Sequence, residues 1–153
     1  MKKLSLLLVV ICCFILTGCG NNEIKEVSTV DNFTTVTTKY GLASVNVLNN
    51  YKESTYITDS VRATLNDMTI EMVIYDSEEN AIKAQDNQIS QFKNVKSVNS
   101  TSNKEKGKNY YKYIMVSNGY YMVTSRIDNT LIFSKTLLTN QSTIENILND
   151  MGY

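Results

Sequence analysis

The 153-residue sequence contains no histidine, no proline and no tryptophan, and it has only three cysteines. Histidine is the commonest general base and metal ligand, so its absence excludes Ser-His-Asp and Cys-His catalytic centres. The acidic residues lack the spacing of a calcium loop, and no glycine-rich stretch could cradle a phosphate. We therefore expect no metal, no cofactor and no enzymatic activity. A Ser-Lys pair stays open, although the neighbours Ser134 and Lys135 would face opposite sides of a strand.

All three cysteines lie near the N-terminus. Lys2 and Lys3 precede an almost unbroken apolar run over residues 4–16, which contains two of the three cysteines. Thirteen helical residues span roughly 20 Å, which is short of the ~30 Å hydrocarbon core of a membrane. A basic start, a short apolar run and small residues after it are typical of a secretory signal peptide. We expect residues 1–18 to be that signal peptide.

The residues Leu16-Thr17-Gly18-Cys19 resemble the lipobox of bacterial lipoproteins. In such precursors the cysteine thiol is joined to diacylglycerol, and the signal is then cut between Gly18 and Cys19. Two or more acyl chains of the palmitate type give stable anchoring, where a single chain is marginal. The alternative is an ordinary signal peptide that happens to end near a cysteine. The resemblance implies a protein held by lipid on the extracytoplasmic face of the cell membrane.

The predicted mature chain is the size of one domain. Cleavage before Cys19 leaves 135 residues, without the two cysteines and two lysines of the signal peptide. No thiol is then free for a disulfide or for nucleophilic attack. Thirteen basic residues remain against fifteen acidic ones, a formal charge near −2 that gives no reason to expect nucleic acid. We expect the lipidated cysteine and a short polar tether at 19–28, and a single globular domain at 29–153.

Hydrophobic periodicity predicts three helices. The first covers about residues 28–41, the second 76–94, and the third about 139–151. The second has the clearest amphipathic stripe, and either Asp76 or Ser77 can cap its N-terminus. Each helix carries one apolar face, which indicates that all three pack on another layer of the domain.

Alternating and β-branched residues predict strands before and after the second helix. The turn-forming pairs Asn66-Asp67 and Asn118-Gly119 favour hairpins, and the second pair is the strongest such signal in the chain. Five strands are expected, over residues 54–65, 68–75, 109–117, 120–128 and 130–137, and the loosely alternating residues 42–48 are a further candidate. The fold class is therefore α+β: an antiparallel sheet of about five strands, with a C-terminal three-stranded meander, packed by about three helices.

Tyrosines gather on the first two strands of the meander and form the tentative binding surface. Tyrosine offers a flat apolar face with a polar tip, which suits sugars, peptides and protein surfaces. Arg126 would share one strand face with some of these rings and could orient an anionic group if that face is uncovered. The alternative is that the rings fill the core or form ordinary cross-strand pairs. The residues of the tentative surface are Tyr110, Tyr111, Tyr113, Tyr120, Tyr121 and Arg126.

Residues 95–108 lose all periodicity and are predicted to be a solvated loop. Lysines are frequent in and just before this stretch, with Glu105 its single acid. The lysines could contact anionic lipid headgroups or a cell-wall polymer, at about 1 kcal/mol for each basic residue near such a surface. The alternative is a long polar connection without a binding role.

The overall plan resembles uncharacterised small lipoproteins of low-GC Gram-positive bacteria. Besides the lipobox, the resemblance is carried by Lys106-Gly107-Lys108-Asn109-Tyr110, the strand Tyr121 to Arg126, and the closing Met151-Gly152-Tyr153. It implies a location and no specific activity. We expect a binding or accessory module at the cell surface, whose candidate partners besides the membrane are cell-wall polymer, a peptide or a membrane protein. The alternative is a structural or assembly subunit of a membrane-associated complex.

Overall fold

The computed structural model describes residues 23–153. The predicted signal peptide 1–18, the lipobox, the cleavage site at Gly18 and the lipidation site at Cys19 lie outside the described residues. Within residues 23–153 no helix is long and apolar enough to cross a membrane.

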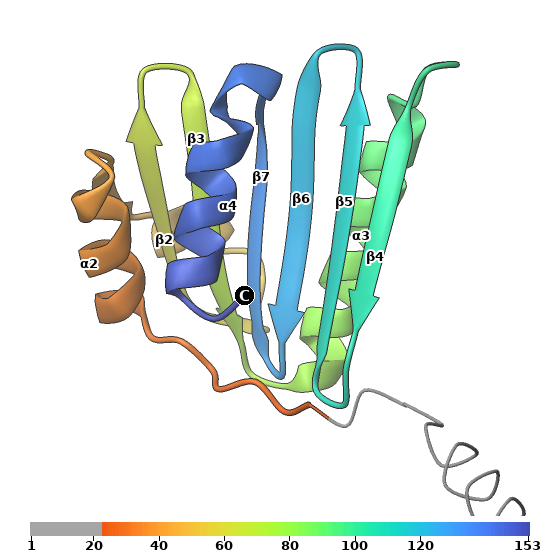
Figure 1. The fold of residues 1–153 in the computed structure, drawn as a ribbon. Helices are drawn as coiled ribbons and strands as arrows, with labels where there is room; N and C mark the ends of the chain where they lie inside the picture. Colours follow the sequence, from red (N-terminus) through yellow and green to blue (C-terminus); the bar gives the residue numbers. More distant parts are fainter. Residues whose placement is uncertain (1–22) are drawn as a thin grey trace, which may run out of the picture.

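The centre of the fold is one seven-stranded sheet in which all neighbouring strands are antiparallel (Figure 1). Its order is β1-β2-β3-β7-β6-β5-β4, so β7 joins the N-terminal strands to the C-terminal meander. The strands are β1 (Ala43–Asn46), β2 (Ile57–Leu65), β3 (Met68–Tyr75), β4 (Thr101–Lys106), β5 (Tyr110–Ser117), β6 (Tyr120–Ile127) and β7 (Thr130–Leu137). The α+β class and the meander are confirmed, whereas the expected count of about five strands is wrong.

The unexpected strand is β4, which lies within the stretch predicted to be a loop. It pairs with β5 on one side and ends the sheet on the other, and all six of its residues are exposed. A strand without a buried face has no need for alternating apolar residues, so periodicity could not reveal it. Its lysines are typical of edge strands, which must resist pairing with other chains.

Helices cover both faces of the sheet. In Figure 1, α2 (Val30–Lys39) and α4 (Gln141–Asp150) lie in front of the sheet and α3 (Glu78–Asn94) lies behind it. Short 3-10 turns, η1 (Leu48–Tyr51) and η2 (Leu138–Asn140), complete the described elements. Helix α3 begins after its N-cap, Ser77, whose hydroxyl accepts from the backbone N–H of Asn80 at 3.4 Å. The three predicted helices are thus confirmed, with ends that shift by a few residues.

The two faces of the sheet bury separate apolar clusters. The larger cluster lies under α2 and α4, and the smaller one lies under α3. Alternation along β5 and β6 assigns neighbouring residues to opposite clusters, as the sequence pattern predicts. The hairpin between these strands turns at Asn118 (φ 52°) and Gly119 (φ 77°), where positive φ favours this residue pair. This turn fixes the register of β5 against β6, the two strands that carry the tyrosines.

Candidate binding groove

The tentative tyrosine surface is divided between the two faces of the sheet. Tyr110 and Tyr121 are fully buried in the cluster under α2 and α4. Tyr113 is buried in the cluster under α3, with its ring next to the half-buried Tyr111. Tyr120 is 40% exposed, and the Lys135 amine lies 5.3 Å from its ring centroid. The rings therefore do not form one surface, and three of the five are core residues.

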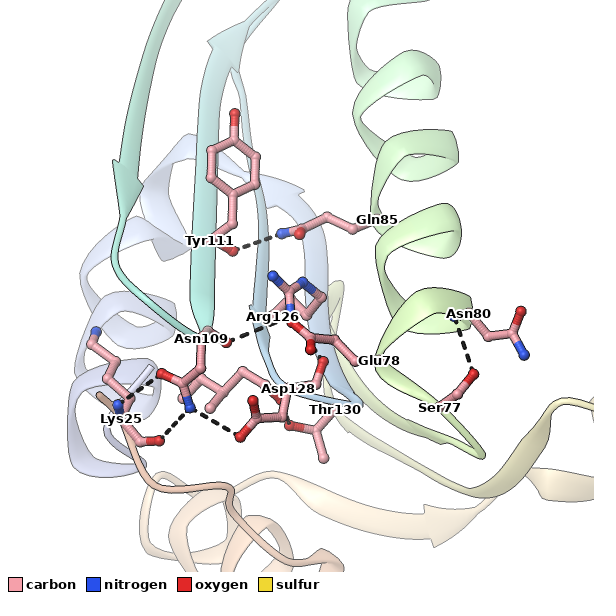
Figure 2. A network of polar contacts seen from close by, with 11 residues as sticks. Lys25, Ser77, Glu78, Asn80, Gln85, Asn109, Tyr111, Arg126, Asp128 and Thr130 are labelled. Carbon is pink, nitrogen blue, oxygen red and sulfur yellow. Dashed lines mark hydrogen bonds and ion pairs between the residues drawn. The ribbon is translucent and has the colours of Figure 1, made fainter. Parts of the chain in front are cut away.

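Arg126 lies on the same face as Tyr111 and is only 7% exposed (Figure 2). Its Nη1 donates to Glu78 Oε1 at 2.8 Å, at the start of α3, and to the carbonyl of Asp128 at 3.0 Å. Its Nε is buried and has no hydrogen-bond partner within residues 23–153. A buried guanidinium donor without a partner is costly, so this nitrogen lowers the stability that the other Arg126 contacts provide.

Lysines surround the open side of this face, between α3 and the edge strand β4. A cavity of about 280 Å³ is lined by Lys93, Lys96, Lys104 and Tyr113, among others. A second cavity, of about 400 Å³, is lined by residues that include Lys93, Lys106, Tyr111 and Arg126. Lys93 lines both cavities, so we treat these two adjacent hollows as a single groove. We call it the lysine groove, and define it by Lys93, Lys96, Lys104, Lys106, Tyr111, Tyr113 and Arg126.

Strand register explains how the lysine groove is built. Lys104 lies directly opposite Tyr113, and Lys106 lies opposite Tyr111, across the β4–β5 pair. Facing residues of an antiparallel pair point to the same side, so the two lysines flank a floor of two tyrosine rings. Lys93 lines the groove from α3, on the other side of those rings. The groove thus has an aromatic floor with basic side chains on both sides.

The lysine groove carries an excess of positive charge. None of its four lysines lies within ion-pair distance of a carboxylate anywhere in the described chain. Asp86 is the acidic side chain among the residues that line the two cavities. Unpaired amines at a concave surface attract anions over a Debye length of about 8 Å at physiological salt.

Gln85 holds the floor of the lysine groove in place. Its side chain is buried on α3, and its Nε2 donates to the carbonyl of Tyr111 at 2.7 Å and to that of Thr124 at 3.4 Å (Figure 2). In the sequence, Gln85 lies four residues after Ala81 and four before Ile89, on the apolar stripe of this helix. A polar residue on an apolar stripe was the available signal that it has a specific partner.

The same helix carries a Ser-x-x-Lys spacing at Ser90 and Lys93, which could suggest a nucleophile with its base. Ser90 is exposed, and its hydroxyl donates to the carbonyl of Asp86 at 2.8 Å. Residues four apart that bond in this way are ordinary features of helices. Nothing in this geometry activates the hydroxyl.

A second polar cluster lies around Glu71 on β3, which is 2% exposed. Its carboxylate accepts from Arg62 Nε at 2.7 Å, from the Ser60 hydroxyl at 3.2 Å, and from the Tyr51 hydroxyl. Burial, with the Glu71 charge nearby, raises the pKa of Tyr75 to about 12. The Glu71 carboxylate accepts from three donors, so this cluster joins η1 to the sheet.

Residues 23–153 contain no group of three or more His, Cys, Asp or Glu side chains that could hold a metal ion. No family model, no curated protein and no solved structure matches the chain. The features that point to a function are therefore the residues of the lysine groove and the N-terminal sequence.

Proposed function

We propose that this chain is an extracytoplasmic lipoprotein, anchored to the cell membrane through Cys19, which binds an anionic cell-wall polymer in the lysine groove. The single observation that carries the proposal is the set of four unpaired lysines around the two tyrosine rings. The lipobox supports the location, and a lipid anchor there would hold the groove near the polymers that surround the membrane.

The shape and chemistry of the groove fit a chain of phosphate groups separated by short polyol or sugar units. Amines attract the phosphates as point charges, and the tyrosine faces can lie against the intervening carbons. Arg126, which lines one end of the groove, adds a guanidinium charge that attracts a phosphate. The affinity would come mainly from charge and would fall as salt increases.

Binding to isolated cell walls tests the ligand. The variant Lys93→Gln/Lys104→Gln should bind about 30-fold more weakly, because each lost lysine costs about 1 kcal/mol near an anionic surface. The matched control is Lys39→Gln/Lys52→Gln, which makes the same change in net charge away from the groove and should bind as the parent does. Walls treated with hydrofluoric acid to remove phosphodiester polymers should bind neither the parent nor the control variant. Equal loss in both double variants would refute a specific groove.

Fractionation of cells tests the anchor separately. Replacement of Cys19→Ala should release the protein from membranes or leave its signal uncleaved. Normal processing together with membrane retention of that variant would refute lipid anchoring.

The alternative function, an assembly subunit of a membrane-associated complex, is favoured by a different surface. Tyr120 and Leu137 lie opposite each other on β6 and β7, each about 40% exposed, and Leu138 and Val95 are also exposed. Exposed apolar side chains that cluster can mark a protein interface. Crosslinking on intact cells separates the two functions: recovered glycan supports the groove, whereas a single protein captured through Tyr120 supports assembly.

A further inference from the structure

The segment that precedes α2 is bound to the far end of the sheet. Figure 1 shows residues 23–29, which we call the strap, crossing beneath the strands from α2 to the turn between β4 and β5. The sequence predicts a short polar tether over residues 19–28. The described part of that tether is held by hydrogen bonds, ring contacts and an ion pair.

Asn109 clamps the strap to the turn between β4 and β5 (Figure 2). Its Oδ1 accepts from the backbone N–H of Lys25 at 3.0 Å, and its Nδ2 donates to the Lys25 carbonyl at 2.9 Å. The same Nδ2 donates to Asp128 Oδ2 at 2.9 Å, in the neighbouring turn. Lys108 N–H donates to the carbonyl of Glu23 at 3.2 Å. The side chain of Asn109 thus pairs with the strap as a neighbouring strand would.

Side chains add to this clamp. The Lys25 amine lies 4.3 Å from the ring centroid of Tyr110 and 3.6 Å from the Glu105 carboxylate. The Tyr110 hydroxyl donates to Glu23 Oε2 at 3.3 Å. The ring of Tyr110 also covers Gly107, where an added Cβ would lie 2.1 Å from a ring atom. Glycine is therefore required at this turn for the ring to approach the strap.

The other end of the strap is fixed as well. Ser28 is 7% exposed, and its hydroxyl accepts from the side-chain amide of Asn32 at 2.8 Å. The Thr29 hydroxyl caps α2 by accepting from the backbone N–H of Asn32 at 3.2 Å. With both ends held, the strap cannot act as a free spacer between the domain and a point of attachment.

We propose that the strap seats the domain against the phospholipid bilayer, with the turn between β4 and β5 facing the headgroups. The inference rests on the lipid anchor of the proposed function. Cys19 and Glu23 are four residues apart, so the chain between them reaches at most about 14 Å. Without the clamp, free chain would extend to the start of α2 at Val30 and reach about 40 Å. The clamp therefore decides whether the domain is held at the membrane surface or moves freely above it.

This placement orients the lysine groove. Lys106 and Arg126 lie toward the end of the sheet that carries the strap, and Lys96 follows the opposite end of α3. The eight residues of β5 separate the two ends by roughly 23 Å, at about 3.3 Å per residue. The groove then runs outward from the membrane, with its basic residues spread along the path of a polymer that leaves the bilayer.

The experiment uses the full chain, lipidated in a bacterial host and reconstituted in phosphatidylglycerol–phosphatidylcholine vesicles with nitroxide-labelled headgroups. The predicted mature chain has no free thiol, so one fluorophore can be attached at Lys108→Cys or at Val98→Cys. Lys108 lies at the turn that carries the strap, and Val98 is fully exposed in the loop at the opposite end. Nitroxide should quench the probe at position 108 at least about threefold more strongly, since the two ends lie roughly 23 Å apart.

Two changes should remove this difference. Asn109→Ala deletes the clamp, and an insert of about six Gly and Ser residues after Asn22 adds about 20 Å of reach without touching the fold. The matched control is Asn103→Ala, an exposed asparagine of β4 whose side chain bonds only the adjacent backbone N–H. This control should keep the quenching difference. The insert keeps the test decisive should Asn109→Ala fail to fold.

Flotation of the vesicles separates the two proposals. Protein that does not float with the vesicles overturns the lipid anchor and the strap proposal with it. Protein that floats but shows equal quenching at positions 98 and 108 overturns the strap proposal alone. A difference that survives the Gly-Ser insert also overturns it, because the strap could then not be what orients the domain.

Discussion

Replacement of Glu78→Gln should weaken folding and strengthen anion binding at the same time. Glu78 Oε1 accepts from Arg126 Nη1 at 2.8 Å, and Arg126 lines the second cavity of the lysine groove. The carboxylate therefore stabilises the buried guanidinium while it repels any anion that enters. Glutamine keeps the volume and one acceptor oxygen but removes the negative charge, which separates these two effects.

The gain in affinity follows from Coulomb's law. An anion at roughly 7 Å from the Glu78 carboxylate is repelled by about 2 kcal/mol at an effective dielectric constant of about 20. The Glu78 side chain is half exposed, so salt and water reduce this to about 1 kcal/mol. The variant should therefore bind a soluble poly(glycerol phosphate) probe about fivefold more tightly.

The loss in stability has a similar size. Removing one partner of a fully buried ion pair costs about 3–5 kcal/mol, but Glu78 is half exposed. Arg126 also keeps its bond to the Asp128 carbonyl at 3.0 Å. We expect the free energy of unfolding to fall by about 1–2 kcal/mol in urea titrations followed by circular dichroism.

The control is Glu79→Gln, one residue further along α3. Both glutamates lie in the first turn of the helix, so their interaction with the helix dipole is the same in kind. Glu79 pairs with Lys83 at 2.7 Å on the exposed side, away from the groove. This variant should change stability by less than about 0.5 kcal/mol and leave affinity unchanged. Weaker or unaltered binding by Glu78→Gln, or equal behaviour of the two variants, would refute the assigned role of the pair.

Three further predictions concern buried groups. Burial raises the pKa of Tyr153 to about 12, against about 10 when unfolded, so this residue should contribute about 2–3 kcal/mol to the fall in stability as pH rises from 10 to 12. In pH-dependent urea titrations Tyr153→Phe should lose less stability than the parent, and an identical pH dependence would contradict this. Glu71→Gln should lower the free energy of unfolding by about 1–3 kcal/mol, since three donors would face a neutral group, and a urea midpoint equal to that of the parent would argue against the cluster. Gly107→Ala should cost about 1–3 kcal/mol in thermal unfolding by displacing the Tyr110 ring; wild-type stability would show that the ring does not need this approach.

Local patterns in the sequence predict most of the elements because the elements themselves are locally determined. The alternation of Met68, Ile70 and Met72 reflects one buried strand face, and Asn118-Gly119 accepts the positive φ values of its turn. The division of the tyrosines between strand faces also follows from alternation. The count of strands does not, because β4 is wholly exposed and its place depends on hydrogen bonds to β5 that no apolar pattern marks.

Some residues of the candidate site can also be named from the sequence, whereas others are found only from the packing of α3. Arg126 and Tyr111 could be named from the meander alone, since both lie on one face of adjacent strands. Which face is open could not be read from the sequence, because that depends on where α3 packs across the sheet. Gln85 and Glu78 acquire their roles only through this packing, which brings one helix against strands far away in the chain.

The sequence by itself determined that residues 20–153 contain no cysteine and no histidine, and it determined the α+β class through local periodicity. Tertiary structure alone decided that scattered lysines border one groove. It also decided that the described part of the predicted tether is held to the turn between β4 and β5. The physical reason is that both features depend on pairing between distant segments. The bonds between Lys25 and Asn109 join residues 84 positions apart, a separation at which sequence patterns carry no information about contact.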